Sequence, residues 1–128
     1  ADLLCELDKY NEEETSLQVA QSDYEQARER SEQLEETYRR KNRAFLDEQA
    51  GLLAQSLAEG QPCPVCGSLH HPTLARLSGD APTEAELEEV KAAWEEAQQK
   101  TQDTSMAAGK QRDNLEEQEK PLIRAMTD

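Results

Sequence analysis

A seven-residue repeat of apolar and aromatic side chains constrains this 128-residue chain more than any other feature. A repeat of seven that is sustained over many turns is typical of helices that wind around one another in a left-handed coiled coil. Seven of the eight positions in the first part of the chain fit it, in the series Leu3, Tyr10, Leu17, Tyr24, Ser31, Tyr38, Phe45 and Leu52. Since residues 2–58 contain no proline, we expect them to form a first coiled-coil helix.

A second series with the same spacing follows in the last third of the chain. Its members are Leu87, Trp94, Thr101, Ala108, Leu115 and Leu122. Thr83 with Glu86 three residues later is a capping box, which marks a helix start. Pro121 lacks an amide hydrogen and should kink or end the helix. We therefore predict a second coiled-coil helix over residues 83–126.

Two such helices imply an all-α fold, an antiparallel coiled-coil helical hairpin. Polar residues such as Glu6 and Glu13 interrupt the companion heptad positions, so we expect a thin, partly polar interface. If Leu52 lies opposite Leu87, Leu3 and Tyr10 have no partner in the hairpin. The shared period then pairs Phe45 with Trp94, Tyr38 with Thr101, Ser31 with Ala108, Tyr24 with Leu115, and Leu17 with Leu122.

The net charge of the chain limits the kinds of molecule that it can bind. The chain has 28 acidic and 14 basic residues, for a formal net charge of −14, which disfavours phosphate backbones. The basic cluster at residues 39–43 is small and surrounded by acidic residues, so we expect no direct binding of nucleic acid. No long apolar run predicts a membrane span and no signal-peptide pattern is present, so we expect a cytoplasmic protein. Because both ends are helix-like, we expect a segment of a longer protein.

The segment between the two helices, residues 59–82, is far longer than a helical hairpin needs. It contains Cys63-Pro-Val-Cys66-Gly67, which has the form of a zinc half-site. Two thiolates at this spacing can reach one ion from a tight turn, and Gly67 permits the positive φ that closes the turn. Zinc favours four ligands in a tetrahedron, whereas this motif supplies two. Cys63 and Cys66 are therefore our candidate metal ligands.

Four hypotheses account for the missing ligands. In the first, His70 and His71 complete the site within one chain. The spacing of Cys63, Cys66 and His71 matches the start of a zinc knuckle. A zinc knuckle needs a further cysteine at position 76, where this chain has Arg76. The motif can be a redox dithiol, although no strand precedes it. The cysteines can form a disulfide, although so short a loop gains little from one.

The fourth hypothesis is that two copies of the chain each give two thiolates to one zinc ion. It accounts for the ligand deficit and suits a half-site at the end of a hairpin, where a second tip can approach. Metal would then hold together two strongly acidic chains that repel one another. We favour this hypothesis, which predicts a homodimer with one zinc ion per two chains and assigns no ligand role to His70 or His71.

A long coiled coil broken at its apex by C-P-x-C-G-S and then H-P resembles the zinc hook of the SbcC family of bacterial SMC-like ATPase subunits. The resemblance is concentrated in residues 62–72. It implies that Cys63 and Cys66 are the zinc ligands of the hook, and that Pro64, Gly67 and Pro72 shape its backbone. It also implies a module that joins coiled-coil arms in DNA double-strand-break repair.

The same resemblance implies partners outside this sequence. The family's full-length proteins carry an ATPase head that works with an SbcD-like nuclease subunit and with DNA. No G-x-x-x-x-G-K-[ST] phosphate loop is present in the 128 residues. We therefore expect this segment to have no enzyme activity. A different class of function, a plain coiled-coil scaffold or adaptor with incidental metal binding, is the alternative.

Overall fold

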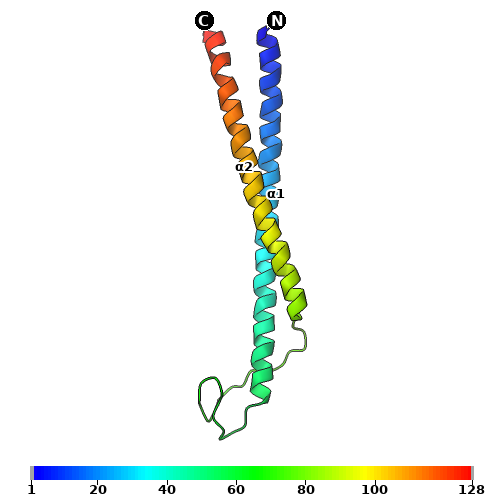
Figure 1. Cartoon of the computed structure of the whole chain (residues 1–128), viewed down its shortest axis with the longest axis vertical. Coiled ribbons are helices and arrows are strands. Elements are labelled where there is room, and N and C mark those ends of the chain that lie inside the picture. Colours follow the sequence, from blue (N-terminus) through cyan, green and yellow to red (C-terminus); the bar gives the residue numbers. More distant parts are fainter. Residues whose placement is uncertain (1, 128) are drawn as a thin grey trace. The chain divides into compact units, whose positions relative to one another are not determined.

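The computed structural model describes residues 2–127, which form two long helices and no strand (Figure 1). Helix α1 is Asp2–Gln55, with 54 residues, and helix α2 is Glu84–Thr127, with 44 residues. The expected all-α fold is confirmed. Helix α1 stops three residues before its expected end, and α2 is displaced by one residue at each end. Within the described range, neither helix is apolar enough over a sufficient length to cross a membrane.

The chain divides into two compact units. Unit 1 combines the described parts of Ala1–Leu34 and Ala93–Asp128, and unit 2 is Glu35–Ala92. Unit 1 therefore joins the first half of α1 to the larger part of α2, whereas unit 2 contains the end of α1, the whole loop and the start of α2. The cysteine motif belongs to unit 2.

In unit 1 the two helices run antiparallel and meet through small and polar side chains. Gln111 Nε2 donates a hydrogen bond to the carboxylate of Glu13 across the interface. Ala27 and Ala97 are both buried and line the same cavity between the helices. No side chain among the described residues is completely buried. The thin, partly polar interface expected from the interrupted heptads is what unit 1 contains.

The pairing of the helices in unit 1 differs from the predicted one. Leu122 lines a cavity with Glu6 and Lys9, not with Leu17. Tyr24 lines a cavity with Ala108, which had been expected opposite Ser31. Together with the Glu13–Gln111 hydrogen bond, these neighbours move α2 by between one and two heptads toward the beginning of α1. The predicted layers within unit 1 are therefore wrong.

Tyr10 illustrates the corrected register. It had been expected to lack a partner, yet it is partly buried in unit 1. This burial raises the pKa of the Tyr10 phenol, and the carboxylates of Glu119 on α2 and Glu14 on α1 raise it further. Tyr10 therefore lies near Glu119, in the last part of α2, and does have neighbours in the hairpin.

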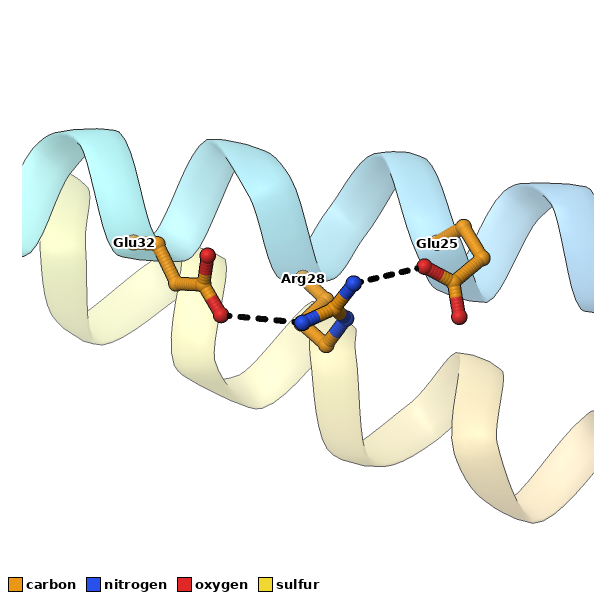
Figure 2. A network of polar contacts seen from close by, with 3 residues as sticks. All are labelled: Glu25, Arg28 and Glu32. Carbon is orange, nitrogen blue, oxygen red and sulfur yellow. Dashed lines mark hydrogen bonds and ion pairs between the residues drawn. The ribbon is translucent and has the colours of Figure 1, made fainter.

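Ion pairs between residues of the same helix lie on the exposed faces of the helices. Arg28 lies between Glu25 and Glu32 on α1, with nitrogen–oxygen distances of 2.8 and 3.1 Å (Figure 2). The hydrogen bond and charge of Glu25, together with Glu32, raise the pKa of Arg28 above its usual value. All three side chains are substantially exposed, so water screens these pairs and they contribute little to the free energy of unfolding. Helix stability rests mainly on the heptad contacts.

In unit 2 the loop runs back along the last turns of α1. Gly51 lies so close to it that an added Cβ would be 2.9 Å from the backbone of Arg76 and Leu77. One turn earlier, Glu48 accepts hydrogen bonds from the Ser78 amide at 2.9 Å and the Ser78 hydroxyl at 3.0 Å. The loop thus occupies the place that the predicted register gave to the start of α2.

The Glu48–Ser78 contact should make the attachment of the loop sensitive to acid. Hydrogen bonds from the backbone and then the side chain of Ser78 hold the pKa of Glu48 below its ordinary 4.5. A lowered pKa stabilises the folded state above the ordinary value, and that contribution is lost as pH falls through the lower folded value. We expect the protection of the Ser78 amide against hydrogen exchange, measured relative to the intrinsic rate at each pH, to fall below about pH 4.5. In Glu48→Gln, exchange should be faster at neutral pH and should lose this acid dependence; an unchanged profile would contradict the assignment.

Helix α2 begins with the cap predicted from the sequence. The Glu86 amide donates to Thr83 Oγ1 at 3.1 Å, and the Leu87 amide donates to the Thr83 carbonyl at 3.0 Å. Replacing such a cap by alanine costs about 1 kcal/mol. We expect Thr83→Ala to lower the free energy of unfolding by about that amount in urea titrations followed by circular dichroism. Thr83→Ser keeps the hydroxyl and should stay near the wild type; equal losses in both variants would argue against the cap.

Pro121 does not end α2. The helix continues through it to Thr127. A proline inside a helix removes one backbone hydrogen bond, and here the loss falls in the last two turns, where few later bonds depend on it. Leu122, the next residue, is among the most buried of the described residues. Its packing in unit 1 favours continuation of the helix, and the expectation that Pro121 stops it is wrong.

Candidate metal centre

The loop forms a small backbone framework around the cysteine motif. Helix α1 closes with hydrogen bonds from the Ser56 and Leu57 amides to the carbonyls of Leu53 and Ala54. Two further amide–carbonyl bonds then join the two sides of the loop, Gly60 to Leu69 at 3.1 Å and Cys63 to Ser68 at 2.9 Å. They hold the segment before the first cysteine beside the segment after the second.

Gly67 closes the turn that carries both cysteines. Its amide donates to the Cys63 carbonyl at 2.8 Å, and its φ is 76°. Side chains other than glycine rarely adopt this left-handed conformation, because their Cβ meets the following carbonyl. The positive φ expected at Gly67 from the sequence is confirmed. The turn brings Cys63 and Cys66 to the same side of the loop, and both are free thiols.

Backbone amides of this turn point at the sulfur of Cys63. The Val65 amide donates to Cys63 Sγ at 3.4 Å. Hydrogen bonds from the backbone amides of Cys66 and Val65 lower the pKa of the Cys63 thiol, although burial acts in the opposite direction. Cys63 is 8% exposed, whereas Cys66 is open to solvent. The turn therefore favours a thiolate, the form of cysteine that binds metals.

His71 joins the two cysteines, which the hypothesis favoured from the sequence did not expect. Its Nε2 lies 3.4 Å from Cys66 Sγ. The donor atoms of Cys63, Cys66 and His71 all lie within 4.8 Å of one another. The spacing of these three residues in the sequence matches the start of a zinc knuckle. The hypothesis of a zinc knuckle was set aside because Arg76 occupies the position of its fourth ligand.

His70, the adjacent histidine, takes a different role. Its Nδ1 lies 2.6 Å from Glu59 Oε1, at the other side of the loop, and its side chain is 67% exposed. The Ser68 hydroxyl donates to the His70 carbonyl at 2.8 Å. His70 therefore connects the two sides of the loop through Glu59, and it is not one of the three clustered donors.

The three clustered donors can hold a metal ion. In a tetrahedral site with bonds of about 2.3 Å to sulfur and 2.0–2.1 Å to nitrogen, adjacent donors lie about 3.5–3.8 Å apart. The 3.4 Å between Cys66 Sγ and His71 Nε2 is close to that spacing. Thiolate and imidazole donors in this number are typical of zinc rather than of the oxygen-seeking Ca²⁺ or Mg²⁺. The residues present therefore fit the ion that the resemblance implies.

Comparison with known proteins agrees with the resemblance. The chain is 44% identical over 48 residues to the SbcC subunit of the nuclease SbcCD from Vibrio cholerae serotype O1. This chain is similar to part of SbcC. The similar stretch covers 38% of the chain and 5% of the SbcC sequence, so the chain spans a small fraction of its relative. No protein-family model matches the chain, and no solved structure matches it.

The similarity to SbcC and the three-donor cluster point in the same direction. The first comes from the order of residues along the chain, and the second from their positions in unit 2. Together they support a segment related to SbcC that has a loop able to bind a metal ion. The two described helices and the loop contain no evident catalytic head, although the name of the relative refers to a nuclease.

Proposed function

We propose that this chain is a zinc hook of an SbcC-like protein, a module through which two copies join by sharing one zinc ion. Cys63 and Cys66 of each copy supply the four sulfur ligands. The observation that carries the proposal is the pair of thiols held by one turn, in the loop that connects two long helices, in a chain similar to SbcC. A zinc-binding loop placed in this way can meet a second loop of the same kind.

The charge of the chain explains why a metal would be needed. Each copy has a formal net charge of −14, so two copies repel one another at low ionic strength. Four thiolates around one zinc ion form bonds that are strong enough to outweigh this repulsion over a small contact. Apolar side chains near the ion, such as Val65 at 76% exposed and Leu69 at 56%, would add contact area between the tips.

In the full-length protein, this module would join coiled-coil arms in the cytoplasm, while an ATPase head works with an SbcD-like nuclease subunit on DNA. The segment itself would be neither an enzyme nor a nucleic-acid binder. Its small basic cluster supports this, because two of its four cations are paired with carboxylates on the same helix, Arg39 with Glu35 and Arg43 with Asp47. Those cations are already matched by carboxylates.

Analytical ultracentrifugation with and without a zinc chelator tests the proposal. We expect a dimer in zinc and single chains after chelation, and the dimer should return when zinc is restored. The alternative function, a coiled-coil scaffold with incidental metal binding, predicts the same particle mass in all three samples. That outcome would exclude the hook.

A further inference from the structure

The three-donor cluster raises a question of ligand number. A tetrahedral zinc ion takes four protein ligands, and two joined tips offer six when His71 is counted with the cysteines. The four cysteines alone satisfy a shared ion. His71 therefore has no place in the joined state, although in a single chain it lies within reach of the same metal position.

We propose that His71 is the third zinc ligand of an unpaired hook, and that it gives up the ion when the cysteines of a second hook arrive. This inference rests on the proposed function, because it describes the state from which the joined hook forms. One chain would hold zinc through Cys63, Cys66 and His71 and leave one coordination position open. A second chain can enter at that position.

The geometry supports His71 over its neighbour. His71 is partly buried between the loop and the end of α1, beside Ala54 and Leu74 in one cavity. Pro72 follows it and restricts its backbone to extended conformations, which reduces the freedom that zinc binding would otherwise have to remove. His70 lies 2.6 Å from Glu59 instead. The ring of His71 is thus held near the metal position before an ion binds.

The charge of the site also favours zinc binding to one chain before a second chain joins. Two thiolates, one neutral imidazole and Zn²⁺ carry no net charge, whereas four thiolates and Zn²⁺ carry two negative charges. In a chain with a formal net charge of −14, the neutral single-chain site adds nothing to the existing repulsion. An unpaired hook can therefore keep its ion until it meets a metal-free second hook. The two cysteine thiols of that second hook then release their protons to solvent and bind the ion, one at the open position and one in place of the His71 imidazole.

The test compares His71→Ala with His70→Ala in a Cys5→Ser background, which removes the exposed third thiol from metal titrations. Zinc affinity is measured by competition with a chromophoric chelator, at dilutions where ultracentrifugation finds single chains. We expect His71→Ala to weaken zinc binding about tenfold or more and His70→Ala to change it less than about twofold. Cobalt(II) in the wild-type chain should show a spectrum typical of two sulfur and one nitrogen ligands, and His71→Ala should lose the nitrogen contribution.

A second measurement avoids mutation altogether. In the wild-type chain with ¹⁵N-labelled histidine, zinc should shift the His71 Nε2 resonance in dilute samples, and dimer formation at high concentration should reverse the shift. Equal zinc affinities in the two histidine variants, or an unshifted His71 resonance, would overturn the inference and leave a zinc-dependent dimer intact. Single chains that bind zinc through His71 but never dimerise would support the His71 assignment and contradict the proposed function.

Discussion

Replacing both Cys63 and Cys66 with serine is expected to abolish zinc binding and zinc-dependent pairing of the chain. Serine hydroxyls remain protonated at neutral pH and do not replace thiolates as zinc ligands. Structural zinc sites built from such donors contribute about 10–16 kcal/mol of apparent binding free energy, so their loss removes the dominant bond between the two copies. Metal analysis and sedimentation velocity of the double variant measure both effects.

The same variant should keep its helices. The heptad contacts and the hydrogen bonds of α1 and α2 do not involve the two cysteines. We expect far-ultraviolet circular dichroism of the double variant to match the wild type within experimental error. Cys5→Ser is the matched control, because it removes an exposed thiol far from the loop in sequence and should leave zinc binding and pairing unchanged. A double variant that still forms dimers in zinc would show that other residues join the copies.

Gly51→Ala is expected to detach the loop from α1, although alanine is the better helix former. The added Cβ would lie 2.9 Å from backbone atoms of Arg76 and Leu77, which is closer than real Cβ atoms approach. The loop must therefore move, at an overpacking cost of about 1–3 kcal/mol. The Glu48–Ser78 hydrogen bonds one turn away should be lost with it. Hydrogen exchange at residues 76–78 measures the detachment directly.

Gly109→Ala is the matched control in α2. An added Cβ there meets no atom within 4 Å, so only the helix propensity changes. We expect this variant to gain about 0.5–1 kcal/mol in free energy of unfolding. Both variants replace glycine with alanine in a helix. Opposite changes in their free energies of unfolding would therefore be due to the contact between Gly51 and the loop. A stabilised Gly51→Ala with a protected Ser78 amide would contradict the close approach.

The sequence was sufficient for the helices because heptad spacing and capping are local properties. The Thr83 cap and the positive φ of Gly67 are of the same kind, and both were predicted from neighbouring residues. The register in unit 1 could not be predicted in the same way, because similar heptads still offer apolar neighbours when one helix slides along the other. The heptads also do not encode the path of the loop along Gly51 and Glu48 in unit 2.

In the candidate site too, the local features were predicted from the sequence and the longer-range contact was not. Cys63 and Cys66 were predicted from a motif of adjacent residues, and their spacing is set by one turn. His71 was set aside because the zinc knuckle pattern fails at Arg76, yet in the folded loop its Nε2 lies 3.4 Å from Cys66 Sγ. A partial match to a motif can still mark a residue that the fold brings to a group of possible metal donors.

The most direct test of the central claim measures zinc content and molar mass on the same sample. Mass spectrometry under native conditions, or light scattering combined with elemental analysis, gives both values for the purified chain. The shared-ion hook predicts particles of two chains that contain one zinc ion, which is half an ion per chain. Particles of one chain with a full zinc ion at every concentration, or a dimer that persists after its metal is removed, would contradict it.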